Sequence, residues 1–162
     1  MIIFKNITDH INTWDAHSKG TFRSGHDLII PYINLELMEN NPISSNTCVI
    51  DFSYLVFREV QEMQEGEKGN SIYFQGKPSA SVNPLLLNEY VIINSWRDST
   101  EIELKISCHT IDLYVNDDFN FRSREHPFVP YDTPKWKANM DNEKIERFFL
   151  RESFDHVLKY LK

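Results

Sequence analysis

The sequence predicts a single α+β domain, in which a sheet is covered by helices from both ends of the chain. Residues 47–60 alternate with period two, as β-strands do, and their second parity becomes apolar from Leu55 onward. That pattern is typical of a central strand with packing on both faces. Other segments repeat this period, whereas both chain ends show helical spacing. We therefore expect a twisted antiparallel sheet of five or six strands, with N-terminal and C-terminal helices packed against it.

Composition and charge limit the class of protein. The chain has 162 residues, of which 41% are hydrophobic and only five are glycine, so one globular domain spanning residues 1–162 is expected. The net charge of -7 argues against binding to nucleic acid or to anionic membranes. The sequence has neither a signal peptide nor an apolar run of the roughly 20 residues that span a bilayer, which makes the cytoplasm the expected location.

The N-terminal helix is predicted from three apolar residues at positions i, i+4 and i+7, namely Ile7, Ile11 and Trp14. Asn6 or Thr8 precedes them as a possible N-cap, because both side chains can accept a hydrogen bond from a free backbone N–H group. We expect this helix to pack on the sheet.

A long antiparallel hairpin is predicted from residues 27–39 and 47–60. The parity of the first strand changes around Pro31, and proline removes a hydrogen-bond donor, so this strand should lie at an edge or carry a bulge there. In the second strand one parity is apolar throughout and should form one continuous face: Cys48, Ile50, Phe52, Tyr54 and Val56.

The middle of the chain alternates between polar and strand-like segments. Residues 61–70 are polar and without period, which predicts an exposed loop, and residues 89–96 read as a strand. Residues 101–108 alternate cleanly, as in a strand with one wet face. The parity slips near His109 and resumes at 111–115, which predicts a β-bulge at that histidine.

The C-terminal segment is predicted to be helical, with Asp141 as its N-cap. An α-helix rotates by about 100° per residue, and at this rotation the apolar residues form two stripes on nearly opposite sides of the helix. The first stripe holds Ile145, Phe148 and Phe149, and the second holds Leu150, Phe154, Val157, Leu158 and Leu161. We expect the helix to break near residues 151–153.

Motifs for catalysis, metal binding and cofactor binding are missing from the sequence. The six histidines lack the spacing of a helical zinc site, and no Cys-x-x-Cys, Gly-x-Ser-x-Gly, phosphate-binding loop or dinucleotide turn occurs. We therefore expect no enzyme activity, metal or cofactor. Cys48 and Cys108 fall on apolar parities and should be buried free thiols. His26 and Asp27 point to opposite faces of a strand, which favours turn capping over catalysis.

Acidic residues dominate one part of the chain. Between residues 27 and 67, Arg58 is the only lysine or arginine, and it is accompanied by eight acids: Asp27, Glu36, Glu39, Asp51, Glu59, Glu62, Glu65 and Glu67. A one-sided negative field can steer a basic partner and raise its association rate by about 10- to 1000-fold. A solvated, charged loop at 61–70 explains part of the same pattern.

The first part of the chain resembles a known class of proteins. Trp14, then His26-Asp27-Leu28 opening a strand, then the hairpin into VIDFSYLVFREV at 49–60, are similar to immunity proteins of bacterial polymorphic-toxin and contact-dependent growth inhibition systems. The resemblance covers roughly residues 10–60. It implies an inhibitor that binds a cognate toxin, commonly a basic nuclease domain, and it implies no catalytic residue.

Partner-binding residues can be proposed on this basis as acids that steer and aromatic residues that anchor. They are Glu59, Glu62, Glu65, Glu67, Tyr73, Phe74, Trp96, Asp117 and Asp118, with Tyr114 as a further anchor if it is exposed. Two alternatives remain open. The chain could be a structural or accessory subunit that pairs through the 27–39 strand. It could also be an enzyme or ligand-binding protein with a pocket near His109, using His26 and a carboxylate such as Asp112 or Glu103.

Overall fold

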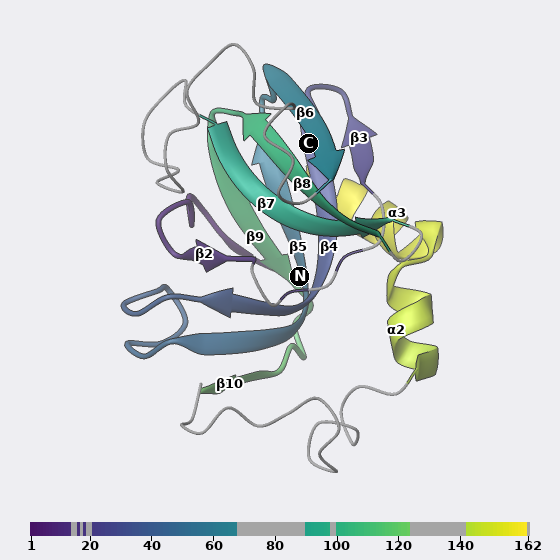
Figure 1. Ribbon diagram of the computed structural model, residues 1–162. Helices are drawn as coiled ribbons and strands as arrows, with labels where there is room; N and C mark the ends of the chain where they lie inside the picture. Colours follow the sequence, from purple (N-terminus) through teal and green to yellow (C-terminus); the bar gives the residue numbers. More distant parts are fainter. Residues whose placement is uncertain are drawn as a thin grey trace.

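In the part of the chain that the computed structural model describes, seven strands form the main antiparallel sheet (Figure 1). Its order is β1-β9-β5-β4-β2, with β10 also paired to β5 and β3 also paired to β4. The strands are β1 (Ile2–Phe4), β2 (Ile11–Asn12), β3 (Phe22–Ser24), β4 (Asp27–Leu37), β5 (Cys48–Arg58), β9 (Thr110–Val115) and β10 (Phe121–Ser123). The structure describes residues 1–13, 16, 18, 21–67, 90–97, 100–123 and 142–161, and it describes only the backbone of 62–67, 90–97, 100–105, 142 and 151.

Strand β5 is central, as its apolar pattern predicts. It pairs with β4 along one side, and with β9 and β10 along the other. The antiparallel hairpin of β4 and β5 is also confirmed, with Leu28 opposite Phe57 at one end and Leu37 opposite Cys48 at the other. The predicted antiparallel α+β class therefore holds in outline, but the sheet has more strands than the five or six expected.

The described residues also form a second antiparallel sheet, whose three strands have the order β6-β8-β7: β6 (Glu62–Glu67), β7 (Tyr90–Arg97) and β8 (Thr100–Ser107). The prediction of an exposed loop at 61–70 was wrong over residues 62–67. These residues are polar and charged, yet each has a partner on β8, from Glu62 opposite Ser107 to Glu67 opposite Ile102. Backbone pairing overrides the low strand propensity of this composition.

The two sheets are joined where β5 leads into β6 and β8 leads into β9. At this corner the Gln61 N–H donates to Ser107 O at 2.8 Å, and the His109 N–H donates to Arg58 O at 2.9 Å. The parity slip at His109 therefore marks the passage of the chain from one sheet to the other. It is not a bulge within one strand.

Helices α2 (Asn142–Phe148) and α3 (Arg151–Leu158) lie along one side of the main sheet (Figure 1). The expected break is confirmed, at residues 149–150. The Ser153 hydroxyl supports this break by donating to Arg147 O at 2.8 Å. Because the chain turns there, both apolar stripes can face the same cluster, in which Phe148, Phe154 and Val157 are buried. The exception is Leu150, which lies at the break and is exposed.

The predicted N-terminal helix was wrong over the described residues. Asn6 has a positive φ of 50°, residues 8–10 form a turn, and Ile11–Asn12 form β2. The Ile7 N–H donates to Ile111 O at 2.8 Å, so this backbone is bound to the sheet. Ile7 is buried and Ile11 is partly buried in the same cluster, which explains their spacing without a helix. Trp14 lies outside the described residues.

Two apolar clusters cover the opposite faces of the main sheet. The first contains Leu28, Ile30 and Leu55, together with Val60 and Ile106 from the junction with the second sheet. The second contains Ile29, Val56 and the buried side of the two helices. Strands β4 and β5 supply residues to both clusters, which explains why their sequences are apolar on both parities.

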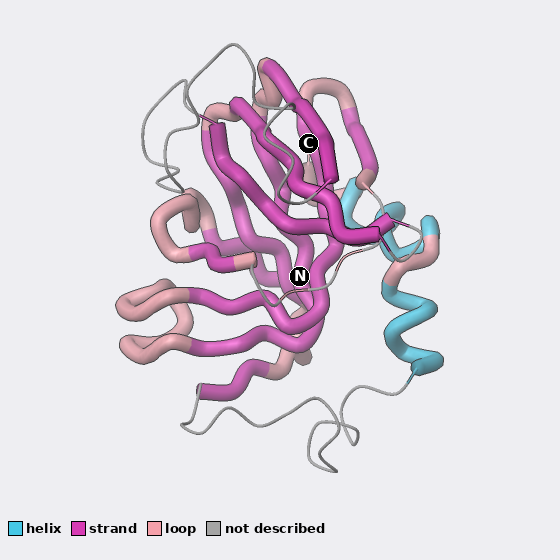
Figure 2. Tube along the Cα trace, in the orientation of Figure 1, coloured by secondary structure: helices cyan, strands magenta, loops and turns pink. Residues whose placement is uncertain are grey.

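Part of the way along the β4–β5 hairpin, the side chains of one parity change from one apolar cluster to the other. On β5, Cys48 and Ile50 belong to the first cluster, whereas Tyr54 and Val56 belong to the second, so the predicted single face was wrong. On β4 the exchange occurs at Asn34, whose φ is 55°, and not at Pro31. Figure 2 shows the hairpin turning away from the rest of the sheet in its distal part, with β10 beside it.

Arg122 of β10 holds this crossover. Its guanidinium donates to Asp51 Oδ1 at 2.9 Å and to Asn34 Oδ1 at 3.2 Å, and both acceptor residues are buried. Burial is the largest influence on Asp51 and raises the pKa of its carboxyl, while the charge and hydrogen bond of Arg122 act in the opposite direction. A charged pair thus links three strands at the place where the faces exchange.

Candidate functional site

The corner between the two sheets exposes Glu59, one of the predicted partner-binding acids. Its φ of 51° is unusual for a residue other than glycine or asparagine. The conformation is held by Asp27, whose Oδ1 accepts the Glu59 N–H at 3.0 Å. Asp27 Oδ2 also lies 2.9 Å from Arg58 Nη1, an ion pair without hydrogen-bond alignment. Asp27 therefore caps a turn, as expected, and engages the cation next to Glu59.

Three further predicted acids, Glu62, Glu65 and Glu67, lie on β6, directly after this corner. Among the three described strands of the second sheet, β6 is a terminal strand. These strands carry five acidic and two basic residues. Charged residues on a terminal strand discourage unspecific strand pairing, and they can also attract a basic partner. Trp96 lies on β7 opposite Glu101, while Tyr73 and Phe74 fall outside the described residues.

The remaining predicted acids follow β9. The Asp117 Oδ1 lies 2.7 Å from the amino group of Met1, which engages this carboxylate in an ion pair. Asp118 is exposed and lines a groove between the main sheet and the helices. Asp118 is thus the predicted residue that coincides with a concave feature of the described surface.

The groove has a volume of about 330 Å³, and three segments that are distant in the sequence form it. Strand β5 and helix α2 supply an aromatic floor. The ring centroids of Phe148 and Phe52 are 5.0 Å apart, and those of Phe148 and Tyr54 are 4.8 Å apart. Tyr54 and Phe148 are buried, whereas Phe52 is half-buried and keeps part of its ring accessible.

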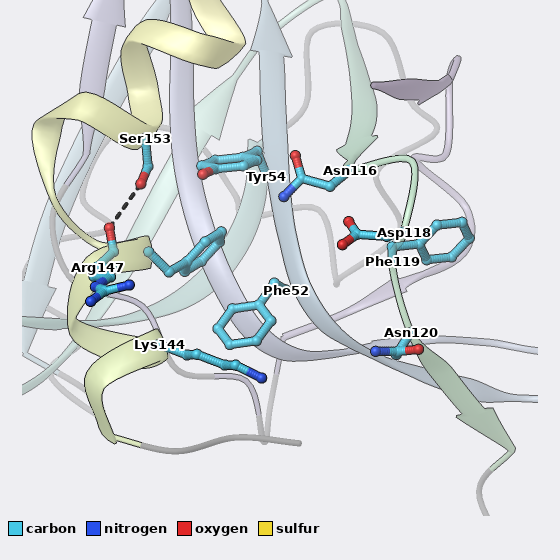
Figure 3. A pocket seen from close by; sticks show the side chains of 10 residues that line it. Phe52, Tyr54, Asn116, Asp118, Phe119, Asn120, Lys144, Arg147 and Ser153 are labelled. Atoms are coloured by element: carbon cyan, nitrogen blue, oxygen red, sulfur yellow. Dashed lines mark hydrogen bonds between the residues drawn. The ribbon is translucent and has the colours of Figure 1, made fainter. Parts of the chain in front are cut away.

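The two walls of the groove carry opposite charges. Figure 3 shows Lys144 and Arg147 of α2 on one side, and Asn116 and Asp118 of the β9–β10 connection on the other. Arg147 also forms an ion pair with Glu143, one helical turn away, and both side chains are 71% exposed. An exposed pair of this kind contributes about 0.3–0.5 kcal/mol, so a ligand can displace it at small cost.

The groove offers binding groups of several kinds. Burial raises the pKa of Tyr54 to about 12, with hydrogen bonding between Tyr54 and Ser153 acting in the opposite direction. Its phenol therefore stays protonated at neutral pH and is a hydrogen-bond donor and not a base. With cationic, amide and carboxylate groups around an aromatic floor, the groove can hold a ligand that has both apolar and charged parts.

The residues of the pocket alternative do not come together in this way. His109 and His26 are exposed, and their backbones join the corner, where the Val60 N–H donates to His26 O at 2.7 Å. Neither lines the groove. The Asp112 carboxylate is buried and accepts bonds from the Asn6 N–H at 2.8 Å and from Lys5 Nζ at 3.2 Å, a structural role. Glu103 lies among the residues described by backbone alone. In the part of the chain with described side chains, no three potential metal ligands cluster.

The structure also places the predicted anchor Tyr114, two of the predicted acids and the predicted edge strand. Tyr114 is 1% exposed, so it is not an accessible anchor. Glu36 and Asp51 are buried, which removes them from the exposed acidic field. The strand predicted to pair with a partner, β4, has neighbours on both sides over 27–29 and 36–37. Among the described residues, no strand pairs with this side of β4 between β3 and β2, where Pro31 lies, so the predicted edge character applies to that part alone.

Both cysteines are free thiols, as expected, but Cys108 is half-buried, whereas burial was expected for both. Cys48 is buried, and burial raises the pKa of its thiol, with hydrogen bonding by Asn41 acting in the opposite direction. Burial also raises the pKa of Cys108 to about 12. Both thiols are therefore protonated and poorly reactive at neutral pH.

Comparison with protein-family models, with curated proteins and with solved structures finds no match to this chain. Among the described residues, neither helix has the length and apolar character needed to cross a membrane.

Proposed function

We propose that this chain is an immunity-type inhibitor, which binds a basic, nuclease-like toxin in the bacterial cytoplasm and neutralises it. The observation that supports this proposal most is the run of acids along one element of the fold. Glu59 and the three glutamates of β6 follow each other at the corner and along a terminal strand of the second sheet, with no basic residue between 59 and 67.

The electrostatics of the corner favour binding to a basic surface. Arg58, which precedes Glu59 in the sequence, forms an ion pair with Asp27 at 2.9 Å, while Glu59 is exposed. A nuclease site is basic because it must hold phosphate, and an acidic strand can occupy the same surface. Such complementarity contributes mainly to association rate and specificity, whereas affinity depends on buried anchors.

Co-expression with the protein encoded immediately upstream tests this proposal. We expect the upstream protein to arrest growth alone, and this chain to restore growth and to co-purify with it. Lysine substitution of the three β6 glutamates should abolish rescue. The matched control places the same charge change on exposed acids elsewhere, namely Glu39, Glu146 and Asp155. Absence of both a complex and growth rescue would contradict the proposal, as would equal effects of the two triple variants.

A further inference from the structure

We propose that the groove between α2 and the β9–β10 connection binds a peptide segment of another protein, in which an aromatic side chain lies between a basic and an acidic residue. This site is separate from the acidic strand β6, and its test requires no toxin. The groove residues come from β5, from the chain between β9 and β10, and from α2 and the start of α3.

The floor of the groove selects an aromatic side chain. Phe52 meets Phe148 edge-on, with an angle of 61° between the rings, and Phe148 also packs on Tyr54. Aromatic rings prefer such edge-to-face contacts at centroid distances of about 4.5–7 Å. A further ring placed over the accessible part of Phe52 would extend this array. The volume of about 330 Å³ is at the small end of ligand pockets, which suits one large side chain with its adjoining backbone.

The walls select the charges beside that ring. Lys144 and Arg147 favour an acidic group along α2, and Asp118 favours a basic group on the opposite wall (Figure 3). A nucleic acid or an anionic membrane would bring only negative charge toward Asp118 and toward a chain of net charge -7. A polypeptide is the polymer that readily carries an aromatic ring between two opposite charges, so charge complementarity favours a peptide.

Binding can be measured on the whole chain by fluorescence anisotropy, with amide chemical shifts to locate the site. The probes are short acetylated peptides in which phenylalanine is joined to lysine and aspartate through glycine spacers, in both orders. We expect saturable binding with shifts at the groove, and we expect the peptide change Phe→Ala to weaken it by about 30-fold, as for a buried anchor. Free phenylalanine should bind much more weakly than the peptide.

Charge reversals on the protein test the walls. Lys144→Glu and Asp118→Lys should each weaken peptide binding by about 3- to 5-fold. The effect of Lys144→Glu should disappear when the acid of the peptide is replaced by asparagine, since the pair is then already lost. Lys159→Glu and Glu39→Lys are matched controls at exposed positions that do not line the groove, and they should change nothing.

The peptide proposal fails if no probe binds saturably at the groove, if the Phe→Ala peptide binds equally well, or if the control reversals match the groove reversals. Equal binding of free phenylalanine would assign the groove to a small ligand instead. None of these results depends on β6, and loss of growth rescue in the β6 variant does not depend on the groove. The two proposals can therefore fail separately.

Discussion

Removal of the Arg122 guanidinium should destabilise the crossover of the β4–β5 hairpin. The substitution Arg122→Met keeps most of the aliphatic side chain but loses the bonds to Asp51 at 2.9 Å and to Asn34 at 3.2 Å. Hydrogen bonds to charged groups contribute about 1.5–3 kcal/mol when buried. Because the arginine side chain is 38% exposed, solvent screening reduces this contribution, and we expect a total loss of about 2 kcal/mol.

This loss should depend on pH through Asp51. Its folded pKa is raised above the ordinary value of 3.8 by burial, so the charged carboxyl weakens the fold above that pKa. The penalty fades as pH falls through the folded pKa toward the unfolded value. Without Arg122 the pKa of Asp51 rises further, and the penalty at neutral pH grows. The difference between Arg122→Met and the parent chain should therefore be largest near neutral pH and smaller in mild acid.

Urea unfolding at about pH 7.5 and at about pH 5 measures both effects. The chain provides a matched control, because β3 and β10 share the sequence Phe-Arg-Ser and Arg23 of β3 is exposed. Arg23→Met should change the free energy of unfolding by less than about 0.5 kcal/mol. The proposed role of Arg122 would be refuted by an equally small effect of Arg122→Met, or by a loss that does not change with pH.

Three other predictions concern the corner, the helices and the thiols. Glu59→Gly should raise the free energy of unfolding by about 0.5–1 kcal/mol, because glycine tolerates the φ of 51°, and a lower value in urea unfolding would contradict this. Phe154→Ala should lower it by about 3 kcal/mol, since this ring is 6% exposed in the second cluster, and a loss below about 1 kcal/mol would mean that α3 contributes little to the core. Cys48 and Cys108 should react with a thiol reagent at about pH 8 only after denaturation, because burial raises the pKa of both, and fast labelling of the folded chain would show an accessible thiol.

The sequence predicts the fold well where burial is the single cause of a pattern of apolar residues. Residues 47–60 are apolar on both parities because β5 is covered on both faces. The two stripes of the C-terminal segment required a break, and the chain does break at 149–150. In both cases the spacing of apolar residues follows directly from burial.

The period-two pattern alone gave a wrong prediction where the backbone of the hairpin rotates. The even positions of β5 look like one face, but the strand exchanges faces near Asp51, opposite the left-handed Asn34. Asn34 and Asp51 are polar residues within an otherwise apolar pattern, and they mark the position of this exchange in the sequence. Residues 62–67 look like a loop because their composition is charged, yet pairing with β8 makes them a strand. Local propensity cannot report a partner that lies some forty residues away.

The two candidate sites also differ in how far the sequence alone predicts them. The three acids of β6 lie within six residues of one another in the sequence, so the sequence alone identifies them as a group. The groove joins Phe52, Asp118 and Lys144 from three distant segments, and only the fold brings them together. Of these, Asp118 alone was a sequence candidate. The apolar spacing of Phe52 and Phe148 predicts core positions for both, and a half-buried ring in a groove, such as Phe52, has the same spacing as a core residue.

The salt dependence of association tests the central proposal most directly. With the co-purified partner in hand, the association rate constant would be measured by stopped flow over a range of ionic strengths. We predict a steep decrease with salt for the parent chain and a much weaker one after lysine substitution of the three β6 glutamates, with the control triple unchanged. A salt dependence that is the same in all three proteins would contradict steering by the acidic strand.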